Sequence, residues 1–268
     1  MILPVTMDGA SGGPGRNPAP RLSIIVPAFN EARRLPATLD RLVSFAASRP
    51  FGAEVLVVDN ASTDSTKAVV AEFASRHPLI TCLHEATRGK GAAVRTGVMA
   101  ASGEYLLFSD ADLAVPIEEA DGFLPPRLKD FDVAIGSREA EGARRYGEPF
   151  ARHLMGRVFN LLVRALLLPG LQDTQCGFKC FRRDVARDIF SANRVHGWSF
   201  DVEILYIARL RGYRIVEVPV PWYYGEESKV RPLRDTRRML IEILKIRENG
   251  RKGLYASPGA RTSGRPKA

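Results

Sequence analysis

The chain has 268 residues, of which 45% are hydrophobic, and its 39 Lys and Arg against 30 Asp and Glu give a net charge of +9. This length supports one substantial core, and α/β proteins of this size often form a single domain. Three cysteines, Cys82, Cys176 and Cys180, are an odd number without zinc-finger spacing, which favours reduced thiols in a cytosolic compartment over a disulfide framework. The positive charge suits anionic partners, among them nucleic acid, phosphorylated substrates and acidic membrane surfaces.

The two ends of the chain differ in composition from the rest. Residues 1–20 are rich in Gly and Pro and lack the apolar stretch of a signal peptide, so we expect a disordered leader. Residues 251–268 combine Gly, Ser and Pro with basic residues, which indicates a basic disordered tail. Polar residues interrupt the longest apolar stretch, residues 154–168, well short of the roughly 18 apolar residues of a spanning helix. The sequence thus predicts one domain over residues 21–250 that does not cross a membrane by itself.

Predicted strands and helices alternate through the first half of the chain. Apolar runs predict strands at residues 22–26, 54–58, 79–84 and 104–109. Helices are expected from residue 31 with Asn30 as its cap, from a cap at Thr63 or Asp64 to about residue 76, and over 92–101. This alternation predicts a mostly parallel sheet with helices on both faces.

The second half of the chain is less regular. Strands are predicted at residues 132–136, 178–182 and 214–218, and a polar loop at 138–150. Helices are predicted at 152–168, 200–211 and 235 to about 247.

Asp110 and Asp112 directly follow the predicted strand 104–109. Ligands of open α/β sheets collect at the carboxyl ends of the strands. Mg²⁺ is usually held there by one or two carboxylates together with substrate phosphates. An isolated Asp-x-Asp triplet is more typical of a turn or a helix cap, so the neighbouring motifs decide the interpretation.

Two polar turns and a Gly-rich segment are expected at the same sheet edge. Asp59 could accept hydrogen bonds from the N–H edge of a base, and Glu31 could bind ribose hydroxyls, whereas Asn30 and Asp64 could simply be helix caps. Lys90, within Arg88-Gly-Lys-Gly91, begins a helix without the spacing of a P-loop and could meet a phosphate or the base.

The ordered set of motifs resembles the inverting GT-A fold glycosyltransferases, and within them the polyprenyl-phosphate hexose synthases. The motifs are Val26-Pro-Ala-Phe-Asn-Glu31, Val57-Val-Asp-Asn-Ala-Ser-Thr-Asp64, Arg88-Gly-Lys-Gly91, Asp110-Ala-Asp112 and Gly136-Ser-Arg138. Residues 173–179, 198–203 and 228–230 resemble the dolichyl-phosphate glucosyltransferase branch rather than the mannosyl one. The resemblance covers about residues 21–250 and implies a single-domain, Rossmann-like α/β fold.

The same resemblance implies roles for individual residues. It places a UDP site at Pro27, Asn30, Glu31, Asp59 and Lys90. It implies Mg²⁺ or Mn²⁺ on Asp110 and Asp112, with Asp112 as the first ligand, and it turns Arg138 toward the reacting phosphates. Ser228 and Lys229 are expected among the ligand-binding residues. The chain departs from the pattern at Asn60, where many relatives carry a second Asp.

The nature of the acceptor decides whether a base is needed. A lipid phosphate is mostly dianionic at neutral pH and needs none, and Arg138, Arg152 and Lys229 are its candidate clamps. A hydroxyl acceptor would need a carboxylate to take its proton. Asp201 is the first candidate for that role, Glu203 the second, and Asp173 ranks below Asp201 because it could instead fix a loop.

The favoured hypothesis is a metal-dependent, inverting transfer of glucose from a UDP-sugar to a polyprenyl or dolichyl phosphate at the cytoplasmic face of a membrane. The basic amphipathic segments 152–168 and 234–252 could lie on acidic lipid or cover the protein's own core. Alternatives are a GDP-mannose donor, a soluble acceptor, or a non-catalytic nucleotide-sugar-binding subunit with a membrane-anchored partner. No nucleic-acid recognition motif accompanies the positive charge.

Overall fold

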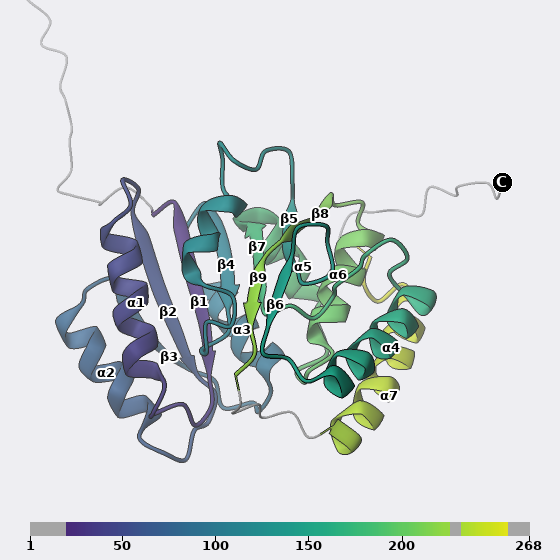
Figure 1. Cartoon of the computed structure of the whole chain (residues 1–268), viewed down its shortest axis with the longest axis horizontal. Helices are drawn as coiled ribbons and strands as arrows, with labels where there is room; N and C mark the ends of the chain where they lie inside the picture. The colour runs from purple at the N-terminus through teal and green to yellow at the C-terminus, as the bar shows by residue number, and fades with distance from the viewer. Residues whose placement is uncertain (1–19, 226–231, 257–268) are drawn as a thin grey trace, which may run out of the picture.

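A seven-stranded sheet with strand order β3-β2-β1-β4-β7-β5-β8 forms the centre of the molecule (Figure 1). The structure, a computed structural model, describes residues 20–225 and 232–256. The strands are β1 (Leu22–Ala28), β2 (Ala53–Asp59), β3 (Ile80–His84), β4 (Tyr105–Ser109), β5 (Val133–Ser137), β7 (Phe178–Arg182) and β8 (Ile215–Pro219), with β6 (Arg144–Tyr146) and β9 (Pro221–Tyr223) paired in a separate small sheet.

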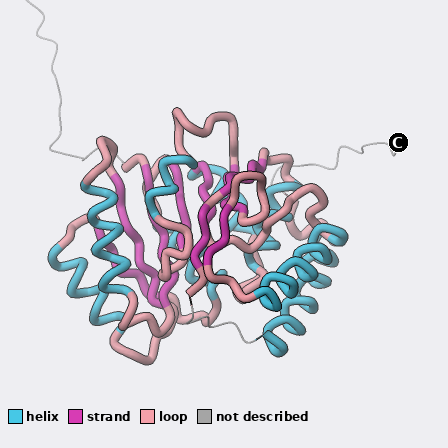
Figure 2. Tube along the Cα trace, viewed as in Figure 1, coloured by secondary structure: helices cyan, strands magenta, loops and turns pink. Residues whose placement is uncertain are grey.

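Helices cover both faces of the sheet (Figures 1 and 2). They are α1 (Leu35–Ala47), α2 (Thr66–Arg76), α3 (Lys90–Ala100), the 3₁₀ helix η1 (Ile117–Phe123), α4 (Phe150–Leu166), α5 (Arg183–Ala192), α6 (Phe200–Leu210) and α7 (Pro232–Arg251). Alternate residues of β1 enter different cores, because side chains alternate between the faces of a strand. Ile25 joins the core formed with α3, α5 and α6, and Ile24 the core formed with α1 and α2.

The direction of β7 determines which loops meet at the site. β1, β2, β3 and β4 run parallel, so their carboxyl ends share one edge. β7 is antiparallel to β4 and β5, and Phe178 pairs with Ser109. The loop that precedes β7 therefore reaches the same edge as the loop that follows β4.

The predicted mostly parallel sheet with covering helices is confirmed, with several local corrections. The first helix begins at Leu35 rather than at residue 31, so Asn30 is not its cap. Asn30 has a left-handed φ of 52°, and its side-chain oxygen accepts a hydrogen bond from the Thr63 N–H at 2.8 Å. The last helix spans Pro232–Arg251 and is longer than predicted. Helix α5, η1 and the β6–β9 sheet were not predicted, while most of the predicted leader and tail lie outside the described residues.

Glu203 proves to be a buried brace rather than a group open to a substrate. Its carboxylate is fully buried and accepts hydrogen bonds from the Val195 N–H at 2.7 Å, the Arg194 N–H at 2.9 Å and the Tyr255 hydroxyl at 2.5 Å. The Asn193 side-chain amide is a further donor. The carboxylate thereby joins α6 to the segment after α5 and to the residues after α7.

We expect Glu203→Ala to lower the free energy of unfolding by about 3 kcal/mol, because several buried donors would lose their acceptor. Urea unfolding followed by circular dichroism measures the change. Glu248→Ala is the control, since Glu248 is 60% exposed and pairs with Lys252 on the surface, and it should leave the unfolding midpoint unchanged. A midpoint for Glu203→Ala equal to that of the control would contradict the bracing role.

Candidate active site

A pocket of about 980 Å³ opens at the carboxyl ends of the parallel strands. Its walls come from the end of β1, the turns after β2 and β4, the start of α3 and α6, and residues of α4, β9 and α7. Most of the predicted site residues border it, namely Pro27, Asn30, Glu31, Lys90, Asp110, Asp112, Arg138 and Asp201. Ser228 and Lys229 lie outside the described residues, so their predicted roles stay predictions.

Asp110 is held in place by contacts on two sides. Its backbone N–H donates to the Gly177 carbonyl at 3.1 Å, and its Oδ1 lies 2.5 Å from Lys90 Nζ. The absence of a side chain at Gly177 makes room for it, because a Cβ there would stand 1.9 Å from Asp110 Oδ2. The sequence analysis did not single out Gly177, although this glycine lies within residues 173–179, one of the segments that carry the resemblance.

Asp112 faces the pocket, and its Oδ1 accepts the Ala114 N–H at 3.1 Å. Desolvation by the pocket walls raises its pKa, and the negative charge of Asp110 raises it further. A divalent cation would relieve this repulsion, and two carboxylates are a suitable donor set for a hard metal. The described residues contain no group of three or more His, Cys, Asp or Glu arranged to hold a metal.

A buried ion pair lies beneath these acids. Lys179 is fully buried on β7, and its Nζ contacts Asp201 Oδ1 at 2.5 Å and donates to the Cys176 carbonyl at 2.7 Å. Burial raises the pKa of Asp201, against the opposing effects of Lys179 and Lys90. Burial alone would lower the pKa of Lys90, but Asp110 and Asp201 outweigh it and the pKa is raised. From the core to the pocket, positive and negative groups therefore alternate in the order Lys179, Asp201, Lys90 and Asp110.

The predicted nucleoside residues differ in their access to the pocket. Glu31 borders the pocket, and its carboxylate lies 3.3 Å from Arg34. Asp59 is 2% exposed and is not among the lining residues; its carboxylate accepts the Ser62 N–H at 3.3 Å and lies 3.1 Å from His84 Nδ1. Its neighbour Asn60 borders the pocket instead. Recognition of a base by Asp59 stays a prediction.

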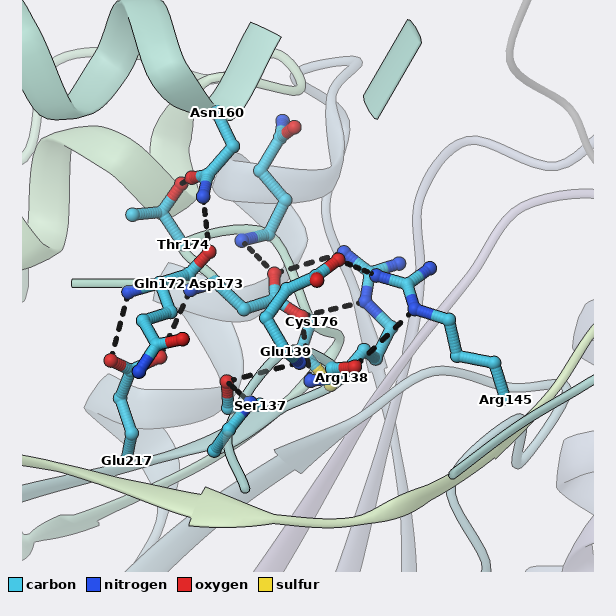
Figure 3. A network of polar contacts seen from close by, with 12 residues as sticks. Ser137, Arg138, Glu139, Arg145, Asn160, Gln172, Asp173, Thr174, Cys176 and Glu217 are labelled. Carbon is cyan, nitrogen blue, oxygen red and sulfur yellow. Dashed lines mark hydrogen bonds and ion pairs between the residues drawn. The ribbon is translucent and has the colours of Figure 1, made fainter. Parts of the chain in front are cut away.

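Arg138 is fixed by a bidentate ion pair with Asp173 (Figure 3). Its Nε and a terminal nitrogen lie 2.7 and 2.9 Å from the two carboxylate oxygens, and its backbone N–H donates to the same carboxylate at 3.0 Å. Burial would raise the pKa of Asp173, yet Arg138 holds that pKa well below its usual range. Asp173 therefore orients Arg138.

Aromatic rings flank the basic groups on this side of the pocket. The Arg138 guanidinium lies 5.3 Å from the centre of the Trp222 ring, and that of Arg152 lies 5.1 Å from the centre of the Tyr224 ring. Both arginines and both rings border the pocket. An anion that enters here would meet the guanidinium groups of Arg138 and Arg152, each of which lies close to an aromatic ring.

Residues 23–190 match the family model described as "Glycosyl transferase family 2". The chain belongs to this family and is a glycosyltransferase. Dolichyl-phosphate beta-glucosyltransferase of Homo sapiens is 35% identical over 250 residues, which cover 86% of this chain and 76% of the relative. The enzyme of the same name from Drosophila melanogaster is 38% identical over 232 residues, covering 81% and 71%. The chain therefore belongs, more narrowly, to the family of dolichyl-phosphate beta-glucosyltransferases.

Solved structures agree on the fold. Glucosyl-3-phosphoglycerate synthase from Mycobacterium tuberculosis, in complex with Mn²⁺, UDP-glucose and phosphoglyceric acid, superimposes with a TM-score of 0.61 at 17% identity, covering 89% of this chain and 86% of that one. Mannosyl-3-phosphoglycerate synthase from Rubrobacter xylanophilus gives a TM-score of 0.64 at 20% identity, covering 92% and 79%. The expected GT-A fold is confirmed.

We expect Gly177→Ala to lower the rate of glycosyl transfer about a hundredfold, because the new methyl group would displace the Asp110 carboxylate by an ångström or more. Steady-state transfer kinetics measure the loss. Gly122→Ala is the matched control, since a Cβ at Gly122 meets nothing within 4 Å, and it should retain the parent rate. Full activity of a folded Gly177→Ala protein would contradict the proposed placement of Asp110.

Proposed function

We propose that this glycosyltransferase moves glucose from UDP-glucose to dolichyl phosphate or a related polyprenyl phosphate, with inversion at the anomeric carbon. The observation that carries the proposal is one pocket that is lined by the Asp110–Asp112 pair, by Arg138, and by residues of α4 that include Arg152. The names of the curated relatives support the acceptor and the sugar. UDP and a divalent metal accompany the structural neighbours, which supports the donor and the metal.

On this proposal the donor diphosphate lies against Lys90 and the two aspartates. Asp110 and Asp112 would hold Mg²⁺ or Mn²⁺, which when bound offsets the negative charge of the departing UDP. Lys90 contributes a positive charge from the start of α3, where backbone N–H groups also favour an anion. Glu31, Asn30 and Pro27 form the neighbouring wall, where the nucleoside is placed.

The acceptor phosphate is placed at Arg138 and Arg152. One of its oxygens attacks the anomeric carbon as the bond from that carbon to the UDP oxygen breaks, so the product has the opposite anomeric configuration. A dianionic phosphate has no proton to lose, and no general base is required. This suits Asp201, whose carboxylate is already paired with Lys179. On this proposal, the Asp201 carboxylate balances the positive charges of Lys179 and Lys90.

We expect Asp112→Ala to reduce transfer of radiolabelled glucose from UDP-glucose to polyprenyl phosphate by a hundredfold or more, because the variant loses a metal ligand. Extraction of lipid-linked product into organic solvent, with added Mn²⁺ or Mg²⁺, measures it. Asp184→Ala, which removes a carboxylate that is 72% exposed on α5, should retain activity.

The same assay separates the alternatives. Lipid-linked product formed from GDP-mannose and not from UDP-glucose would show that the donor is GDP-mannose. Hydrolysis of UDP-glucose without lipid-linked product would indicate a soluble acceptor. Binding of UDP-glucose without turnover would favour a non-catalytic subunit. Retained activity in Asp112→Ala would exclude the metal role assigned to Asp112.

We propose further that α4 rests on an anionic membrane surface. Its exposed side chains are strongly apolar: Phe150, Leu154, Met155, Val158, Leu161 and Leu162 are between 36% and 78% exposed. The helix carries three arginines and no acidic residue, which adds electrostatic attraction to acidic lipids. Arg152, Met155, Gly156 and Phe159 of the same helix border the pocket, so lipid-bound phosphate would have a short route to Arg138.

The proposed location is the cytoplasmic face of the membrane. The three cysteines of the chain are free thiols, and Cys176 and Cys180 are buried, which suits a reducing compartment. Among the described residues, no helix is both long and apolar enough to span a bilayer. Contact through α4 or through a membrane-anchored partner would serve the same acceptor.

We expect Val158→Glu/Leu161→Glu to abolish flotation with anionic liposomes, since it puts two charges into a face whose residues are 62% and 64% exposed. Transfer to a short, water-soluble polyprenyl-phosphate analogue should persist, because neither residue borders the pocket. Met99→Glu, at a 44% exposed site on α3, should float like the parent. Undiminished flotation of the double variant would refute the α4 surface and direct attention to a protein partner.

A further inference from the structure

Asn60 is positioned at the junction between the sheet and the loop that leads into α3. It follows β2 directly, is 5% exposed, and its backbone N–H donates to the Ala28 carbonyl at 2.8 Å. Its side chain reaches away from the sheet toward residues 85–89. Asn60 therefore links the carboxyl end of β1 and the loop before Lys90.

The side-chain amide of Asn60 bonds to three backbone groups of that loop. Nδ2 donates to the Glu85 carbonyl at 3.1 Å and to the Thr87 carbonyl at 2.8 Å, while Oδ1 accepts the Gly89 N–H at 2.8 Å. Two carbonyls and one N–H fix the orientation of the amide, because only nitrogen can donate to the carbonyls. Both ends of the amide are engaged.

The loop is held at two further places. The Glu85 carboxylate accepts the Thr87 N–H at 2.6 Å and a hydrogen bond from the Thr96 hydroxyl. At the other end the Gly91 N–H donates to the His196 carbonyl at 2.9 Å. Gly89, with a φ of 139°, packs so closely that a Cβ would stand 2.1 Å from that same carbonyl oxygen. The path of the chain into Lys90 is thus closely defined.

We propose that Asn60 is a positioning residue for the donor site, and that the loop contacts of this chain require an amide at the position where many relatives carry Asp. This inference rests on the proposed function for its ligand, the diphosphate of the donor. The loop fixed by Asn60 carries Arg88, Gly89 and Lys90 along the pocket wall and sets Lys90 Nζ 2.5 Å from Asp110. An aspartate at position 60 has the same shape but no donor when ionised, so the Glu85 and Thr87 carbonyls would face a negative charge.

The loop either shifts in Asn60→Asp or the new carboxyl group takes up a proton. Two facing carbonyls and burial both disfavour the charged form and raise the pKa of the introduced carboxyl group. A protonated carboxyl group can donate one hydrogen bond again. The defect should therefore be present at neutral pH and diminish as the pH falls, a behaviour that a general packing defect would not show.

Calorimetric binding of UDP with Mn²⁺ tests the proposal on the full chain. At about pH 7.5 we expect Asn60→Asp to bind UDP roughly ten- to a hundredfold more weakly than the parent. Near pH 5.5 the ratio to the parent should fall to about threefold or less. Asn60→Ala should be weak at both pH values. Glu72→Gln, which exchanges a carboxylate for an amide at a 69% exposed side chain on α2, should match the parent at both.

Hydrogen exchange of the unliganded proteins separates this inference from the proposed function. In Asn60→Asp the amides of residues 86–90 should lose protection at neutral pH and regain it near pH 5.5, whatever the ligand is. If the parent fails to bind UDP, the proposed donor is wrong and the exchange result alone judges Asn60. Unchanged loop protection in Asn60→Asp, or equal UDP affinity of parent and variant at neutral pH, would overturn the positioning role.

Discussion

The ammonium group of Lys179 beneath the pocket determines which charges the site above it can carry. A buried cation is tolerated only with a close counter-ion and satisfied hydrogen bonds. Asp201 and the Cys176 carbonyl supply both. Asp201 in turn favours the charged form of Lys90, and Lys90 pairs with Asp110. Replacing Lys179 by an apolar residue would leave Asp201 buried without its nearest partner, so the effect would extend to the pocket acids.

This alternation of charge also explains how an anionic donor can enter. Lys90 has a partner in Asp110, and Asp110 and Asp112 repel one another. On the proposed function, a metal–diphosphate complex would bring both signs at once: the cation would meet the carboxylates, and the phosphate oxygens would meet the lysine. Such an exchange would keep every charge paired. Two close approaches define the positions of these groups: Gly177 lies against the Asp110 carboxylate, and Gly89 lies against the His196 carbonyl.

Sequence reasoning was most successful where a local pattern sufficed. Apolar runs separated by helices predict the parallel strands β1 to β4, and their parallel direction brings Asp110 and Lys90 to the same edge of the sheet. The antiparallel β7 could not be foreseen, because its apolar run is equally compatible with either direction. The bracing role of Glu203 and the amide clamp of Asn60 depend on contacts with segments 8 to 52 residues away and 25 to 29 residues away. No spacing rule encodes such partners.

Contacts between α4 and the residues around Arg138 link the proposed membrane face to the proposed acceptor site. Asn160 of α4 donates to the Gln172 carbonyl and accepts from the Thr174 hydroxyl at 3.2 Å (Figure 3). Arg157 pairs with Glu139 at 2.7 Å. These contacts join α4 to both sides of the Arg138–Asp173 ion pair. If α4 lies on the bilayer as proposed, the height of Arg138 above the lipid phosphates is set by this same helix, and the acceptor can stay in the membrane while its phosphate reacts.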